Sequence, residues 1–188
     1  MSAANLTVTG VTVTPIAVVD PPLLNSIGVH QPYALRAIVQ VHTDVGITGL
    51  SEAYGDDPTL DRLRRTIPVV TGLDPFDVHG LGRRVANALA GIAADTPTEL
   101  IGAPSVHKAV AATVAAFEVA FLDIQGKATG RPVCDLLGGA VRPAVPFSAY
   151  LFYKWAGHPG EPPDEFGPAL DPDGIVAQAH RMVDTYGC

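Results

Sequence analysis

The residues best suited to binding a small polar ligand are Asn25 and His30, which lie in the segment Asp20–Pro32 (DPPLLNSIGVHQP). An amide and an imidazole can both donate hydrogen bonds to hydroxyl and carboxylate groups. The segment is too long for a tight hairpin and too apolar for a plain solvent loop, and such loops are often lids or binding loops. Two interpretations are open: a ligand-binding pair, or an Asn25 that completes a turn beside an ordinary surface histidine.

Two aromatic residues, Tyr150 and Phe152, lie two apart in a segment whose pattern predicts a strand over 144–153. Side chains two apart on a strand point to the same face, so both rings face away from Ala149 and Leu151. They form either one wall of a ligand site or part of an apolar core. Both interpretations are open, because aromatic residues on strands commonly pack in cores.

Other charged residues favour structural roles. Asp123 and Lys127 are four apart in a predicted helix, which is the spacing of an ion pair on one helix face. Glu118 lies among apolar residues of the same helix, and we expect it to make a structural hydrogen bond rather than to act in catalysis. Lys154 follows the aromatic pair, but we do not include it among the predicted site residues.

The common metal-binding and phosphate-binding motifs are absent from the sequence. The histidines show no HxH, HxxxH or Cys/His spacing of the kind that binds zinc. The neighbouring Asp56 and Asp57 point apart and have no third ligand at a fixed spacing. No GxGxxG, GxxxxGK(S/T) or GxSxG motif occurs. The residues alone therefore assign no metal ligand and no catalytic residue.

Composition indicates a globular protein, because 47% of the 188 residues are apolar and only 16% are charged. The net charge is -7 and the basic residues are scattered, which argues against nucleic acid as a partner. The sequence shows no long apolar run and no signal-like N-terminus, so we expect a cytoplasmic protein without a membrane partner. Cys134 and Cys188 are expected to be reduced, with a disulfide as the alternative.

Alternation of apolar and polar residues predicts three antiparallel strands, over 7–18, 33–43 and 47–54. Helices are then predicted over 60–70, from a cap at Asp74-Pro75, from Ser105 to Gly130, and from Asp171-Pro172 to Gly187. A loop is predicted over 91–104. The apolar residues of the last helix are expected to face inward: Ile175, Ala179, Met182, Val183 and Tyr186.

The segment Glu118–Gly139 has the sequence EVAFLDIQGKATGRPVCDLLGG. Its pattern predicts the end of a long helix at a glycine, a short helix that begins at a proline, and two glycines after that short helix. Together with the order of strands and helices, it resembles the mandelate racemase and muconate lactonizing enzyme branch of the enolase superfamily. Within that branch, Leu23–Pro32 (LLNSIGVHQP) and Pro146–Lys154 (PFSAYLFYK) are most similar to the glucarate dehydratases.

The resemblance implies an α+β fold with two parts. Residues 1–139 would form a capping domain, made of a three-stranded antiparallel sheet and a helical set. Residues 140–188 would form the first β/α unit of a TIM-type barrel. A complete barrel takes about 250 residues, so we expect an incomplete barrel and an N-terminal part of a longer enzyme.

The resemblance also implies a function, that of an acid-sugar dehydratase acting on glucarate or a related diacid. In this superfamily a Lys or His base removes a proton next to a carboxylate, and Mg²⁺ stabilises the ene-diolate. Loss of a β-hydroxyl then gives a keto-deoxy acid. The implied substrate-binding residues are Asn25, His30, Tyr150 and Phe152. The base and the Mg²⁺ ligands belong to later barrel strands, so we expect this chain alone to be inactive.

Two other functions stay open. One is a different enolase-superfamily reaction, such as racemisation or cycloisomerisation. The other is a non-catalytic binding or assembly module, in which an unpaired strand edge pairs with a second copy of the chain. A homo-oligomer is compatible with either one.

Overall fold

The computed structural model describes residues 6–26, 28–92 and 105–187. Contacts divide the chain into two compact units. Unit 1 contains the described residues up to Ala17 and Leu35–Ala140, and unit 2 contains Val18–Ala34 and the described residues from Val141 onward. The predicted loop over 91–104 lies mostly outside the described residues, as does Cys188, whereas Cys134 is an exposed free thiol. The domain boundary after Gly139 stays a prediction.

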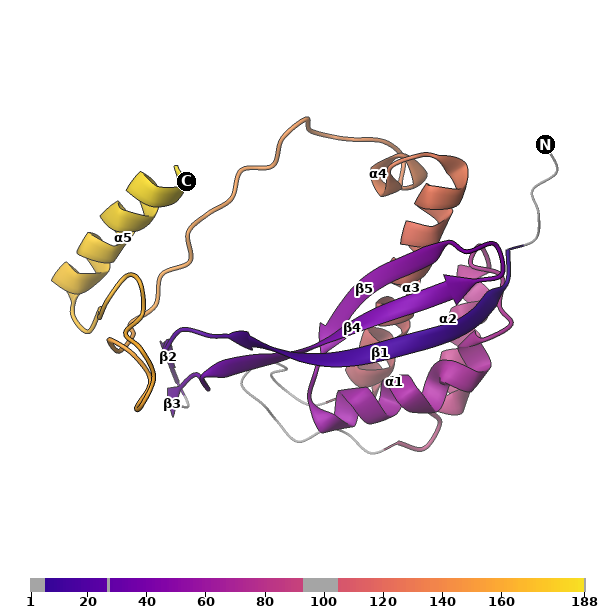
Figure 1. Ribbon diagram of the computed structural model, residues 1–188, viewed down its shortest axis with the longest axis horizontal. Helices are drawn as coiled ribbons and strands as arrows, with labels where there is room; N and C mark the ends of the chain where they lie inside the picture. Colours follow the sequence, from indigo (N-terminus) through magenta and orange to yellow (C-terminus); the bar gives the residue numbers. More distant parts are fainter. Residues whose placement is uncertain (1–5, 27, 93–104, 188) are drawn as a thin grey trace. The chain divides into compact units, whose positions relative to one another are not determined.

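The predicted three-stranded antiparallel sheet is confirmed, with the strand order β1–β4–β5 (Figure 1). Its strands are β1 (Val8–Val19), β4 (Tyr33–Thr43) and β5 (Thr48–Tyr54). The alternation of β4 places Ala37, Val39 and Val41 in the core, fully buried, while their sequence neighbours face the other side. The sheet is open, and the described residues form no closed barrel.

Three helices cover one face of this sheet: α1 (Asp57–Val70), α2 (Val78–Ala88) and α3 (Val106–Thr129) (Figure 1). The helix α3 contacts β5 and buries Phe117, Phe121 and Ile124 completely. Gly49 of β5 makes this close approach possible, because a Cβ there would lie 2.1 Å from the Ala120 carbonyl oxygen. The alanine-rich sequence of α3 thus serves close packing of a helix on a sheet.

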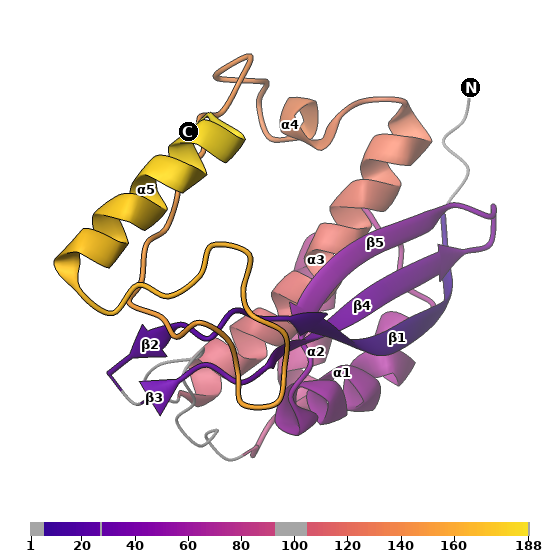
Figure 2. The same cartoon turned by 60° about the vertical axis from the view of Figure 1, so that its left-hand side comes forward.

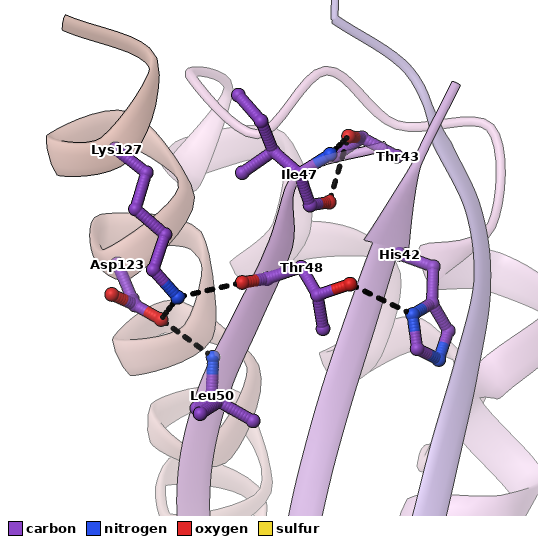
Figure 3. A network of polar contacts seen from close by, with 7 residues as sticks. All are labelled: His42, Thr43, Ile47, Thr48, Leu50, Asp123 and Lys127. Carbon is purple, nitrogen blue, oxygen red and sulfur yellow. Dashed lines mark hydrogen bonds and ion pairs between the residues drawn. The ribbon is translucent and has the colours of Figure 1, made fainter. Parts of the chain in front are cut away.

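The predicted ion pair of α3 is confirmed, with 2.7 Å between Lys127 Nζ and Asp123 Oδ2 (Figure 3). The same two side chains also bond the outer edge of β5. Asp123 Oδ2 accepts from the Leu50 amide at 2.8 Å, and Lys127 Nζ donates to the Thr48 carbonyl oxygen at 2.7 Å. These are backbone groups that a further strand would otherwise pair with, so the ion pair covers an edge of the sheet.

By length and composition α3 could also cross a membrane, but half of its most apolar stretch is buried inside unit 1. Core helices of globular domains meet the same criterion, and packing on the sheet accounts for the apolar composition of α3. The helix ends as expected at Gly130, whose φ of 67° is left-handed. After Pro132 the short helix α4 (Val133–Leu136) follows.

The helix α1 ends at Val70, where the predicted helix over 60–70 ends, and it includes the exposed Pro68. One helix boundary differs from the prediction. The helix α2 begins after Asp77, whose Oδ1 accepts from the Gly80 amide at 2.8 Å, and not at Asp74-Pro75. Asp74 instead closes the preceding turn by accepting from the Phe76 amide at 2.9 Å. Both aspartates can cap a helix, and their local sequence does not decide between them.

Unit 2 contains two short paired strands, β2 (Leu24–Asn25) and β3 (Gly28–Val29), and the helix α5 (Pro172–Tyr186) (Figure 2). The strand predicted over 144–153 is wrong: the segment forms no ladder, and only Lys154 makes isolated bridges, to Leu23 and Ala169. A strand requires a neighbour with a matching edge, and the described chain offers this segment none over its length.

The prediction for the inward face of α5 is only partly confirmed. Ile175, Ala179 and Met182 are half-buried, but Val183 and Tyr186 are exposed. The side chain of Tyr186 lies 6.0 Å, centroid to centroid, from Phe166, which is its one recorded ring contact among the described residues.

Candidate functional site

Asn25 lies at the point where β2 and β3 meet. Its side-chain oxygen accepts a hydrogen bond from the Gly28 amide at 3.0 Å, and the strand register pairs the same two residues. Gly28 has a φ of 139°, a backbone conformation that residues with a Cβ rarely adopt. Asn25 therefore completes a turn, as one of the two interpretations of the sequence expected. Its role toward a ligand stays a prediction.

His30 directly follows β3, and both its backbone amide and its ring make polar contacts. Its amide donates to the Leu23 carbonyl oxygen at 2.8 Å, and its ring Nδ1 lies 3.1 Å from Asp20 Oδ2. The side chains of His30 and Asp20 are only 17% and 25% exposed. His30 is therefore a fixed, mostly buried group, unlike an ordinary surface histidine.

Three of the four predicted site residues form a continuous row of ring contacts. The His30 ring centroid lies 6.2 Å from that of Phe152, and the Phe152 ring lies 4.8 Å from Tyr150 in an edge-to-face arrangement. Phe152 is half-buried, whereas Tyr150 is 79% exposed. Tyr150 is thus no core residue in the described chain, and its role toward a ligand stays a prediction.

Backbone hydrogen bonds fix the aromatic segment beside β2. The Leu24 amide donates to the Tyr153 carbonyl oxygen at 2.7 Å, and the Trp155 amide donates to the Pro22 carbonyl oxygen at 3.2 Å. Asn25 follows Leu24 directly, so the same contacts bring its strand next to the aromatic pair. All four predicted residues therefore belong to one small region of unit 2.

A buried ion pair supports this region from within. Lys154, 1% exposed, pairs with Asp164, and its Nζ also lies 5.5 Å from the Phe166 ring centroid. Asp164 Oδ2 accepts from the Phe166 amide at 2.9 Å as well. The backbone of Lys154 exchanges two hydrogen bonds with Ala169, at 2.9 and 3.0 Å. Lys154 therefore anchors the segment and does not face a ligand.

A cavity of about 460 Å³ lies in the same unit, and its lining includes Asp20, Tyr33 and His158. None of the four predicted site residues lines it. The lining also includes Glu161 and Glu165, whose carboxylates disfavour an anionic ligand, while Asp164 is paired with Lys154. The predicted site is therefore the surface beside His30 and not this cavity.

The described residues do not fit a Mg²⁺ site. Across residues 6–26, 28–92 and 105–187, no three His, Cys, Asp or Glu side chains gather closely enough to hold a metal ion. Oxygen ligands from several carboxylates or carbonyls are what Mg²⁺ requires. We therefore derive no step through this ion from the present chain.

Sequence reasoning missed Asp20 and set Lys154 aside. Asp20 lies ten residues before His30, a separation that corresponds to no helix or strand spacing. The sequence did contain a signal for this contact. Asp20 and His30 lie near opposite ends of one long loop between two predicted strands, and the ends of such a loop lie close together when the strands pair. For Lys154 the signal was a single lysine in the apolar run PFSAYLFYK.

Comparison with known proteins identifies relatives along most of the chain. The N-terminal domain of mandelate racemase / muconate lactonizing enzyme matches residues 8–138. A probable glucarate dehydratase of Streptomyces coelicolor is 46% identical over 190 residues, which is 97% of this chain and 44% of that protein.

Two crystal structures are also similar. An enolase from Thermobispora bispora, complexed with magnesium and formate, is 59% identical, with a TM-score of 0.90 over 95% of this chain and 42% of its own. An enolase from Mycobacterium smegmatis, complexed with tartrate, is 53% identical with a TM-score of 0.90, over 100% of this chain and 43% of its own. This chain thus spans less than half the length of these relatives.

Proposed function

Because this chain belongs to the mandelate racemase / muconate lactonizing enzyme family of the enolase superfamily, we propose that it is part of an acid-sugar dehydratase similar to glucarate dehydratase. The whole enzyme would remove a proton next to a carboxylate, expel a β-hydroxyl and release a keto-deoxy acid. The 46% identity to a probable glucarate dehydratase supports this proposal. So does the tartrate complex of the M. smegmatis relative, since tartrate is a hydroxylated diacid.

Within that enzyme, this chain would supply a substrate-binding wall. The observation that carries the proposal is the row of His30, Phe152 and Tyr150 beside the strand of Asn25. An amide, an imidazole and a phenol offer hydrogen bonds to hydroxyls and carboxylates, and the aromatic rings offer an apolar surface to the C–H groups of a sugar chain. This combination suits an acyclic polyhydroxy diacid.

The chemical step would need groups that the described residues do not provide, since they hold no cluster able to bind a metal. We therefore expect the 188-residue chain to bind D-glucarate without converting it. Incubation with D-glucarate and Mg²⁺, followed by detection of a keto acid, checks this expectation. Turnover above the background rate would contradict it.

Calorimetric titration with D-glucarate tests the binding wall directly. Phe152→Ala removes the ring that contacts both His30 and Tyr150, and we expect about fivefold weaker binding, since ring contacts of this kind contribute about 1 kcal/mol. Phe147→Ala is the matched control, because Phe147 lies on the same segment, is 86% exposed and has no recorded ring contact among the described residues. Equal affinities for the two variants, or no heat of binding by the unaltered chain, would refute the proposal.

A further inference from the structure

The carboxylate of Asp20 controls the one described polar contact of the His30 ring. An ionised carboxylate only accepts hydrogen bonds. With 3.1 Å between Asp20 Oδ2 and His30 Nδ1, the proton of the neutral imidazole must lie on Nδ1. The other ring nitrogen, Nε2, makes no hydrogen bond to any described residue and is then a bare acceptor.

Asp20 is itself fixed through its backbone. Its amide donates to the Pro32 carbonyl oxygen at 3.0 Å, and its own carbonyl oxygen accepts from His158 Nε2 at 2.9 Å. His158 is only 9% exposed, so this bond lies in a mostly buried region. Because a carbonyl oxygen can only accept, His158 must carry its proton on Nε2. The backbone of Asp20 is therefore held in place on both sides of its side chain.

We propose that Asp20 is a positioning residue that fixes the neutral His30 ring with its proton on Nδ1 and thereby makes Nε2 an acceptor for a substrate hydroxyl. This inference rests on the proposed function, because it assigns the acid sugar as the ligand. A hydroxyl can donate to Nε2, whereas an ionised carboxylate cannot. The arrangement selects a hydroxylated diacid over a plain diacid of the same length.

The tautomer of His30 decides the positioning role without any ligand. Ring ¹⁵N shifts separate protonated from bare imidazole nitrogens, and they are measured on the full chain at a pH high enough for neutral rings. We expect the Nδ1–H form in the unaltered chain. An Nε2–H form there would overturn the proposal, and this result does not depend on the folding of any variant.

Asp20→Asn removes the negative charge and replaces one carboxylate oxygen with an NH2 group that can donate to Nδ1, so we expect His30 to change to the Nε2–H form, as an aspartate-to-asparagine change does in a catalytic triad. Asp171→Asn is the matched control: Asp171 caps α5 in the same unit, and asparagine caps a helix equally well. The control should keep the Nδ1–H form. No change of tautomer in Asp20→Asn, with the emission of Trp155 unaltered as a sign of intact folding, would overturn the positioning role.

Titration with D-glucarate and with adipate, a diacid of the same length without hydroxyls, tests the hydroxyl contact. We expect Asp20→Asn to reduce the preference for D-glucarate about tenfold, which is the effect of one hydrogen bond, while Asp171→Asn keeps it. A changed tautomer with an unchanged preference would overturn the hydroxyl contact. Failure of the unaltered chain to bind D-glucarate, with the Nδ1–H form observed, would overturn the proposed function and leave the positioning of His30 standing.

Discussion

Removal of the charge of Asp164 should destabilise unit 2 strongly. The Lys154 side chain is 2% exposed and that of Asp164 is 15% exposed, so the pair is almost fully withdrawn from water. Loss of one partner of a buried ion pair typically costs about 3–5 kcal/mol, because the other charge stays buried without compensation. We expect about 3 kcal/mol for Asp164→Asn, since Asp164 keeps some contact with water. This value lowers the ratio of folded to unfolded molecules by more than 100-fold.

The double variant Lys154→Met, Asp164→Asn separates the charge from the packing. Methionine keeps most of the lysine stem, and the asparagine oxygen can still accept from the Phe166 amide. With no buried charge left, we expect the double variant to lie within about 1 kcal/mol of the unaltered chain, because neutral replacements of buried pairs are often tolerated. The double variant should therefore be more stable than Asp164→Asn alone.

Urea unfolding followed by tryptophan emission measures this effect in unit 2. Trp155 is the single tryptophan of the chain, directly follows Lys154 and is bonded to Pro22 through its amide. Circular dichroism, which is dominated by the helices of unit 1, serves as the internal control. A change below about 0.5 kcal/mol for Asp164→Asn, or a double variant that is no more stable than the single one, would refute the reasoning.

Two further predictions concern unit 1. Gly49→Ala should destabilise it by about 3 kcal/mol in urea unfolding, because the new Cβ would lie 2.1 Å from the Ala120 carbonyl oxygen. Gly82→Ala is the control: a Cβ there has nothing within 4 Å, so this change should stabilise α2 by about 0.5–1 kcal/mol. Equal effects of the two changes on stability would contradict this explanation. The double change Asp123→Ala, Lys127→Ala should lower the free energy of unfolding by about 1–2 kcal/mol and promote self-association in light scattering, since it uncovers the β5 edge. The control is removal of the exposed pair of Arg131 and Asp135, whose charged atoms lie 3.9 Å apart; this change should leave the stability almost unaltered. Strictly monomeric behaviour of the first variant, with unchanged stability, would refute the role of the ion pair at the sheet edge.

Most of unit 1 could be predicted from sequence because its signals are local. The alternation of Ala37, Val39 and Val41 decides which face of β4 is buried, and the burial confirms it. The helix α3 was predictable for the same reason, from its apolar spacing and its terminal glycine. The strand expected over 144–153 was not, because a ladder depends on a neighbouring edge, which a local pattern does not contain.

For the candidate site, sequence reasoning found the residue types but not the support around them. Tyr150 and Phe152 were expected side by side on one strand face, and although the segment forms no strand, their rings do lie 4.8 Å apart. The contact of His30 with Asp20 depends on how β2 pairs with β3, which the loop sequence does not determine. The anchoring of Lys154 by Asp164 likewise depends on the path of a loop rich in proline and glycine.

The most direct test of the account is a set of intermolecular NOEs between D-glucarate and the 188-residue chain. We expect contacts from the C–H protons of the sugar acid to the rings of Tyr150 and Phe152, accompanied by a shift change at His30. Contacts confined to other residues at saturating ligand would contradict the claim that these side chains form a wall for an acid sugar.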